Sequence, residues 1–165
     1  QHNMRPVTDA GGHATEPVVF TTNRAEIVVE PGNPHGISGL ADLIDDDLIV
    51  VACSPEVPCG RYAEQVLDNA GLGVTFKSLE HNVRAVVSKV VIGEADAGIV
   101  YATDVIAAGD AAHGVPIPDD VNVVAEYPIA VTRGAAHPEA AQAFVDFVLS
   151  SAGQSILESH GFAAP

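Results

Sequence analysis

The chain alternates between short apolar runs and longer stretches in which apolar residues recur with helical spacing. The apolar runs at 26–30, 48–53 and 97–101, together with the alternating segment 74–79, predict strands. Helical spacing is clearest from Val83, where five valines fall at i, i+3, i+4, i+7 and i+8. Further helical segments are expected at about 40–44, 61–70, 104–112, 138–149 and 152–160. Strands that alternate with helices predict an α/β fold with a mostly parallel sheet.

Three other segments carry weaker patterns. Residues 1–16 are polar and glycine-rich without a period, which favours an exposed loop. Residues 121–125 and 129–132 look like two short strands, with Tyr127 and Pro128 separating them. In the helix expected at 138–149, one face gathers four apolar side chains: Ala140, Phe144, Phe147 and Val148.

Composition narrows the class of protein. The 165 residues are 47% hydrophobic, as in a folded globule, and no apolar run approaches the ~20 residues that span a bilayer. The net charge is −15, with seven Lys plus Arg. A basic face for phosphate contacts cannot be built from so few cations, so no nucleic-acid partner is expected.

Recognised catalytic patterns are missing. No Gly-x-Ser-x-Gly elbow and no phosphate loop ending in Gly-Lys-Ser/Thr occur in the sequence. The seven histidines are scattered and form no metal-ligand pair on one helical face, so no metal site is expected. A thiol enzyme that uses Cys59 with His81 remains a weakly supported alternative. The expected protein is therefore not an enzyme.

Candidate binding residues come from the geometry of α/β sheets, which bind ligands at the carboxyl ends of their strands. Two of the loops there lead into helices whose first N–H groups are free to meet an anion, in the segment 58–62 and just after Asn82. Tyr101 ends a third strand and carries its hydroxyl to the same edge. Taken singly, each has a plainer interpretation: a helix entry, a cap at Asn82, a packing tyrosine.

Cys53 and Cys59 are the two cysteines, six positions apart. This spacing is neither a C-x-x-C redox motif nor a zinc site. In an oxidising compartment the pair would close a small disulfide loop, and in a reducing one both would be small apolar fillers.

At these junctions the sequence resembles a known family. Val-Pro-Cys-Gly-Arg-Tyr-Ala at 57–63, Asn-Val-Arg-Ala at 82–85 and Ala-Gly-Ile-Val-Tyr-Ala-Thr-Asp at 97–104 resemble, in order, signature segments of the molybdate-binding proteins of molybdate ABC transporters. Residues 20–34 look like the family's crossover strand and 126–131 like its return strand.

The resemblance implies a periplasmic-binding-protein-like fold of type II, with one nearly complete lobe and a remnant of the other. Residues 1–28 would form the remnant and crossover, 29–124 the complete lobe, and 125–165 the return strand and last helices. The ligand would be molybdate or tungstate, held by the backbone N–H groups of Cys59 and Val83 and the hydroxyl of Tyr101. No cofactor is implied.

The resemblance also implies partners and a location. The protein would deliver its oxyanion to a membrane permease, in the periplasm or elsewhere outside the cytoplasm, with anchoring through an amino-terminal segment as one arrangement. The family's first-lobe segment, which carries two serine ligands, has no counterpart in this chain, so the chain alone is expected to bind oxyanion weakly or not at all. A solute-binding or ligand-sensing lobe for another small anion is the alternative.

Overall fold

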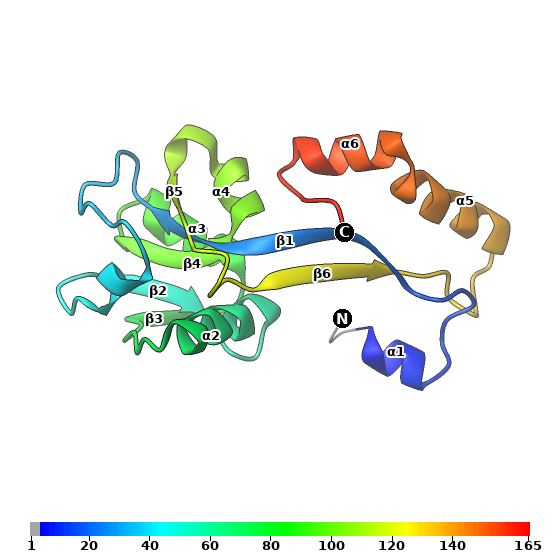
Figure 1. The fold of residues 1–165 in the computed structure, drawn as a ribbon, viewed down its shortest axis with the longest axis horizontal. Coiled ribbons are helices and arrows are strands. Elements are labelled where there is room, and N and C mark those ends of the chain that lie inside the picture. The colour runs from blue at the N-terminus through cyan, green and yellow to red at the C-terminus, as the bar shows by residue number, and fades with distance from the viewer. Residues whose placement is uncertain (1–3) are drawn as a thin grey trace. The chain divides into compact units, whose positions relative to one another are not determined.

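The chain folds into two compact units in the computed structural model, which describes residues 4–165. One unit comprises residues 24–124, and the other joins the residues up to 23 with 125–165. The strand β1 (Val18–Val29) contributes residues to both units (Figure 1).

The sheet of unit 24–124 has the strand order β3-β2-β4-β1-β5. Its other members are β2 (Val50–Cys53), β3 (Ser78–Glu80), β4 (Ala97–Tyr101) and β5 (His113–Pro116). β2 runs parallel to both β3 and β4, whereas β1 runs antiparallel to β4 and to β5. All strands here except β1 therefore point the same way, which confirms the mostly parallel sheet predicted from the sequence.

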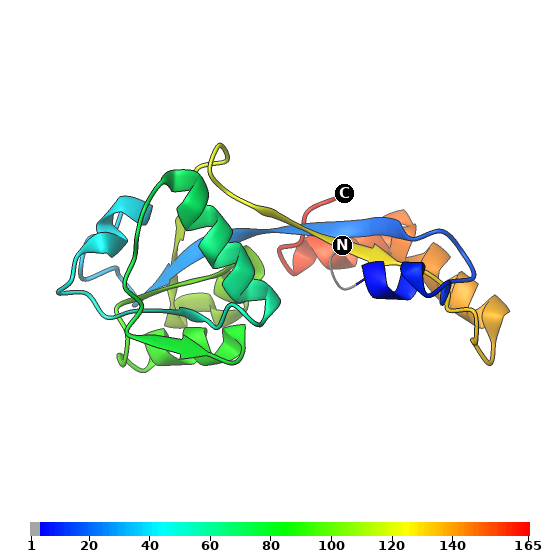
Figure 2. The ribbon, with the colours of Figure 1, turned by 90° about the horizontal axis from the view of Figure 1, so that it is seen from below.

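Helices cover both faces of this sheet because successive strand residues point to opposite sides. Val50 and Ala52 pack in one cluster with Val66 of α2 (Pro58–Ala70). Val51 packs in a second cluster with Val86 of α3 (Val83–Val91), and α4 (Ala102–Ala108) lies against that cluster. Figure 2 shows α2 and α3 on either side of the sheet. Two short 3₁₀ turns complete this unit, η1 (Leu40–Ile44) and η2 (Gly109–Ala111).

The second unit is built on β6 (Val124–Ile129), which pairs with β1. Tyr127 of β6 lies edge-on to both Phe20 and Phe162, with ring centroids 6.4 and 5.8 Å away. The helices of this unit are α1 (Arg5–Asp9), α5 (Pro138–Leu149) and α6 (Ser151–Ser159). Gln154 of α6 donates its amide to the Phe20 carbonyl oxygen at 2.9 Å, which ties α6 to β1.

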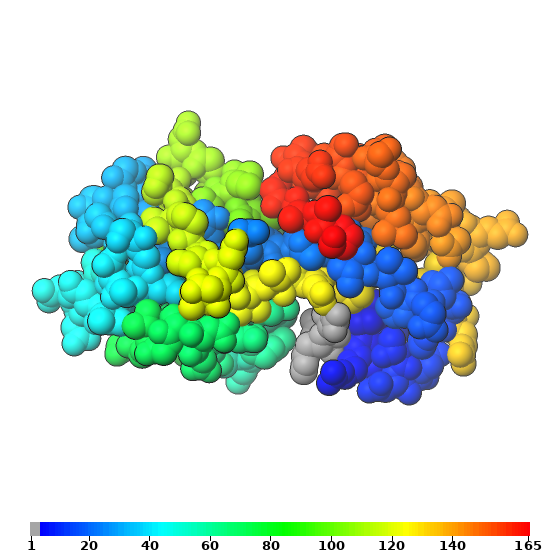
Figure 3. All heavy atoms as spheres, viewed as in Figure 1, coloured from blue at the N-terminus to red at the C-terminus, as the bar shows by residue number. Residues whose placement is uncertain are grey.

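The apolar face predicted for α5 is largely exposed. The Phe144 side chain is 61% exposed and Phe147 48%, whereas Val145 is buried. Figure 3 shows α5 and α6, in orange to red, as a continuous surface of their unit. Among residues 4–165, no element covers this face.

Several sequence predictions at element boundaries were wrong. The segment expected to be a loop contains α1, whose first turn accommodates Pro6 because that position needs no N–H donor. The two strands expected around Tyr127 and Pro128 are one strand, β6. Proline is tolerated there because β6 pairs only with β1 among the described strands. β5 was not predicted, since its four residues show no alternation.

The strand expected at 74–79 is reduced to β3. Val74 and Phe76 still pack against the core, so the apolar signal was real although most of the segment is not in the ladder. Within residues 4–165, no helix is both long and apolar enough to cross a bilayer.

Candidate functional site

Cys59 lies in the first turn of α2, where N–H groups have no acceptor within the helix. The helix begins at Pro58, after the extended residue Val57, which makes no side-chain cap. A side chain at Gly60 would overlap the carbonyl oxygen of Ser54. Glycine therefore lets the start of α2 press against the loop that follows β2.

A disulfide joins Cys53, the last residue of β2, to Cys59. The two Cα atoms are 5.7 Å apart, within the usual range for a disulfide, and both residues are buried. The first turn of α2 is thus fixed covalently to the end of the neighbouring strand. The bond also leaves no free cysteine in the chain, so the thiol-enzyme alternative has no nucleophile.

Val83 is the first residue of α3, and Asn82 caps that helix as predicted. The Asn82 Oδ1 atom accepts the N–H of Ala85 at 3.0 Å. The cap therefore satisfies the third N–H group of the helix, and the N–H groups of Val83 and Arg84 point out of the helix end.

Tyr101 is the last residue of β4 and the residue from which α4 starts. Its N–H donates to the Asp104 Oδ2 atom at 3.1 Å, and its half-buried ring lies edge-on to Tyr62 of α2, with centroids 6.0 Å apart. Burial raises the pKa of the Asp104 carboxyl, while the Tyr101 N–H and the nearby Arg84 charge act in the opposite direction.

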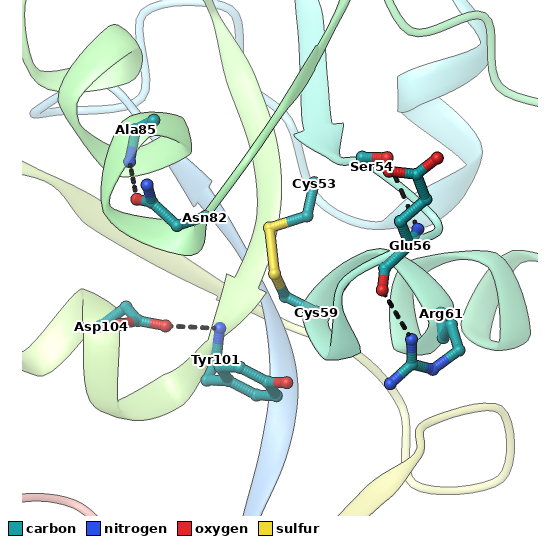
Figure 4. Close-up of a disulfide and its surroundings, with 9 residues drawn as sticks. All are labelled: Cys53, Ser54, Glu56, Cys59, Arg61, Asn82, Ala85, Tyr101 and Asp104. Carbon is teal, nitrogen blue, oxygen red and sulfur yellow. Dashed lines mark hydrogen bonds between the residues drawn. A yellow bond between two sulfur atoms is a disulfide. The ribbon is translucent and has the colours of Figure 1, made fainter. Parts of the chain in front are cut away.

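The topology brings the three predicted residues, Cys59, Val83 and Tyr101, to the carboxyl ends of adjacent parallel strands. β3, β2 and β4 are adjacent and parallel, and each leads directly into a helix start: α3, α2 and α4 respectively. Their carboxyl ends therefore lie together. Figure 4 shows Asn82, Cys59 and Tyr101 on these helix starts around the disulfide. Such an edge can hold an oxyanion by N–H groups and a hydroxyl, aided by the partial positive charge of each helix start.

Two basic side chains near this edge, those of Arg61 and Lys89, are paired with protein groups. Arg61 donates to the Glu56 carbonyl oxygen at 3.0 Å (Figure 4). Lys89 of α3 forms an ion pair of 2.7 Å with Glu80, the last residue of β3. The hydrogen bond from Lys89 is the main cause that lowers the pKa of Glu80, followed by the hydrogen bond from Ser78. The three candidate donors, two backbone N–H groups and a hydroxyl, are themselves neutral, and the positive charge of Arg84 lies near them.

Sequence reasoning missed two residues that position Tyr101. Asp104 accepts a hydrogen bond from the backbone N–H of Tyr101. The spacing Tyr101-x-x-Asp104 is typical of a capping box and could have predicted this contact from the sequence. Tyr62 contacts its ring from a different helix, and no local pattern encodes that contact.

Comparison with known proteins gives a consistent result. Residues 3–163 match the family model described as bacterial extracellular solute-binding protein. The molybdate-binding protein ModA of Mycobacterium tuberculosis is 40% identical over 162 residues, which cover 98% of this chain and 62% of that relative. The chain thus spans less than two thirds of the relative's length.

Solved structures agree on the fold. The substrate-binding domain of a putative molybdenum ABC transporter from Clostridium difficile superposes with a TM-score of 0.81 at 26% identity, covering all of this chain and 74% of that one. The sulfate-binding protein SubI of Mycobacterium tuberculosis has a TM-score of 0.82 at 21% identity, covering 99% and 66%.

Proposed function

Since the chain belongs to the family of bacterial extracellular solute-binding proteins, we propose that it provides one side of the oxyanion site in the substrate-binding component of an ABC transporter. The ligand we propose is molybdate or tungstate. The 40% identity to a molybdate-binding protein supports this choice over other small anions.

The observation that carries the proposal is the convergence of three helix starts on adjacent parallel strand ends. Cys59 and Val83 would donate backbone N–H groups and Tyr101 its hydroxyl. Donors of this kind suit a fully deprotonated tetrahedral anion, because hydrogen phosphate would turn its O–H toward donors only. Sulfate carries no proton, so it must be discriminated by size.

A neutral donor set also fits a protein with a net charge of −15. Charges more than ~8 Å away are largely screened at physiological salt, so the local donors decide whether an anion binds. Three donors can form hydrogen bonds with only some of the anion's oxygen atoms. We therefore expect this chain alone to bind weakly, with the remaining donors supplied by a segment like the one that carries the family's serine ligands.

In the proposed function the protein captures its anion, closes around it and presents the closed form to a membrane permease. The protein would act outside the cytoplasm. The disulfide supports that location, because such bonds persist in oxidising compartments. No catalytic step and no cofactor are part of the proposal.

Thermal unfolding in millimolar oxyanion tests the proposal and tolerates weak binding, because a ligand that binds only the folded state raises Tm. Molybdate and tungstate should raise Tm more than sulfate or chloride at matched ionic strength. Tyr101→Phe should lose most of that shift, since one hydrogen bond to a charged group contributes about 1.5–3 kcal/mol. Tyr127→Phe, in the other unit, is the matched control.

Equal shifts in all four salts would refute an oxyanion site of this kind. A larger shift with a small organic anion would move the proposal to the alternative ligand class. An unchanged molybdate shift in Tyr101→Phe would remove the hydroxyl from the site.

A further inference from the structure

A cluster of three side chains lies at the opposite end of β4 from the candidate oxyanion site. It consists of Glu30, His35 and Asp96. The His35 Nε2 atom lies 3.1 Å from the Asp96 Oδ1 atom and 3.9 Å from the Glu30 Oε2 atom. One ligand atom from each residue lies within 4.8 Å of the others, and no second group of this kind occurs among residues 4–165. The sequence, read for histidine pairs on one helix, predicted no metal site, and these three residues are brought together only by the fold.

Strand register explains why the two carboxylates meet. Val29 pairs with Ala97 at the end of the β1–β4 ladder, so Glu30 and Asp96 are the next opposed positions. Like charges placed directly opposite one another on antiparallel strands are destabilising. The His35 Nε2 atom lies within 4 Å of both carboxylates, and a cation bound among the three residues would offset the repulsion between Glu30 and Asp96.

Hydrogen bonds fix the Asp96 side chain and the loop that carries His35. The Asp96 Oδ2 atom accepts the N–H of Ile49 at 2.7 Å, which leaves Oδ1 facing His35. The loop that carries His35 is fixed by the side chain of Asn33, which exchanges two hydrogen bonds with Ile37, at 2.7 and 2.9 Å. The side chains of Asp96, Glu30 and His35 are 18, 27 and 42% exposed, so an ion can reach them.

We propose that Glu30, His35 and Asp96 form a binding site for a divalent first-row transition ion, for which Zn²⁺ is the probe. One imidazole nitrogen and two carboxylate oxygens are ligands that Zn²⁺ accepts at about 2.0–2.2 Å, with water in the open position. Ligand atoms around such an ion lie roughly 3–3.5 Å apart. The 3.1 Å between His35 and Asp96 is already in that range, and the 3.9 Å between His35 and Glu30 is slightly longer.

A pocket of about 490 Å³ has His35 in its lining. Asp42, Asp45 and Asp47 also line this pocket, and their negative charge attracts cations toward His35. This pocket lies away from the strand ends that carry Cys59 and Tyr101.

The bound ion would fasten the loop that carries His35 to the ends of two neighbouring strands. β4 runs five residues from Ala97 to Tyr101, about 15 Å at the usual rise per residue. The ion site and the oxyanion site are therefore at opposite ends of the strand. The metal proposal does not depend on the proposed function, and either can fail without the other.

Competition between the 165-residue chain and a chromogenic chelator for Zn²⁺ tests the site. We expect one Zn²⁺ per chain and a rise in Tm with Zn²⁺. His35→Gln, Glu30→Gln and Asp96→Asn should each weaken binding by more than about tenfold, the loss typical even of outer-shell partners. Asp96→Asn keeps an oxygen for the Ile49 N–H, so its folding should survive.

His137→Gln is the control, because His137 precedes α5 in the other unit and is not in the cluster. The expected control result is unchanged Zn²⁺ affinity. Co²⁺ in place of Zn²⁺ should give a d–d absorption spectrum that disappears in His35→Gln. No Zn²⁺ binding, or equal binding by the wild type and His35→Gln, would overturn the proposal. Mg²⁺ binding as tight as Zn²⁺ would overturn the assignment to a transition ion.

Discussion

The Oδ1 atom of Asn82 accepts the N–H of Ala85 at 3.0 Å, and this cap leaves the first two N–H groups of α3 without an acceptor in the helix. The capped group is the third of the helix. The N–H of Val83, the first helical residue, is left available for a ligand.

Val83→Pro should remove one oxyanion donor while preserving the helix. Proline is favoured at the first helical position, and the extended backbone of Asn82 (φ −160°, ψ 161°) is compatible with a following proline. We expect unfolding free energy to change little and the molybdate-induced rise in Tm to fall sharply. Ser151→Pro, at the first position of α6 after the extended Ser150, is the matched control and should retain the molybdate effect. If both variants respond to molybdate as the wild type does, Val83 is not a donor.

Gly60→Ala should destabilise the protein by about 1–3 kcal/mol, the usual cost of forcing an extra carbon into a packed site. The added Cβ atom would overlap the Ser54 carbonyl oxygen, so the start of α2 must move. Gly73→Ala is the control, because its added carbon meets no atom within 4 Å, and it should stay within about 0.5 kcal/mol of the wild type. Urea unfolding of the two variants checks both values. Equal stability of the two would mean that α2 does not start against Ser54.

Reduction of the Cys53–Cys59 disulfide should lower the unfolding free energy by about 2 kcal/mol, the chain-entropy estimate for so short a loop. Reduction should also weaken the response to molybdate, since the first turn of α2 is then no longer fixed to β2. Urea unfolding with and without reductant measures the first effect. The double variant Cys53→Ala/Cys59→Ala should show no effect of reductant, and a drop in its stability on adding reductant would trace the effect to something other than the disulfide.

Asp104 should make stability depend on pH in a direction opposite to that of Glu80. Burial raises the pKa of Asp104, so between the unfolded and the folded pKa of this carboxyl the folded state binds more protons than the unfolded state. The contribution of Asp104 to the unfolding free energy therefore grows as pH falls through that window. The unfolding free energy of the wild type minus that of Asp104→Asn should therefore increase from about pH 7 to about pH 4.

For Glu80, the hydrogen bond from Lys89 lowers the pKa, so its contribution is present above the unfolded pKa and is lost as pH falls through the folded pKa. The corresponding difference between the wild type and Glu80→Gln should decrease over the same pH range. Urea unfolding across that range measures both. Curves of the same sign would contradict the assigned environments.

Sequence patterns were sufficient to predict the edge where the candidate site lies. The valines of α3, the apolar strand that ends at Tyr101 and the loop before Cys59 are all local signals, and the sheet rule connects them. The disulfide was left open because spacing alone does not give the distance between two Cα atoms.

Pairings between residues far apart in the chain could not be predicted from the sequence. Glu30 and Asp96 are opposed only because Val29 pairs with Ala97, and no local pattern specifies that register. β6 was split in two because proline usually interrupts a strand, whereas Pro128 lies in a strand with one partner among those described. In both cases tertiary pairing decided the outcome.

The central claim is that the first N–H groups of α2 and α3 bind an oxyanion, and amide NMR during a molybdate titration of the oxidised chain tests it most directly. The claim predicts that the amide resonances of Cys59 and Val83 shift most, that they saturate together, and that Ser151 at the start of α6 does not follow them. Shifts of equal size at all helix starts, or none at Cys59 and Val83, would contradict it.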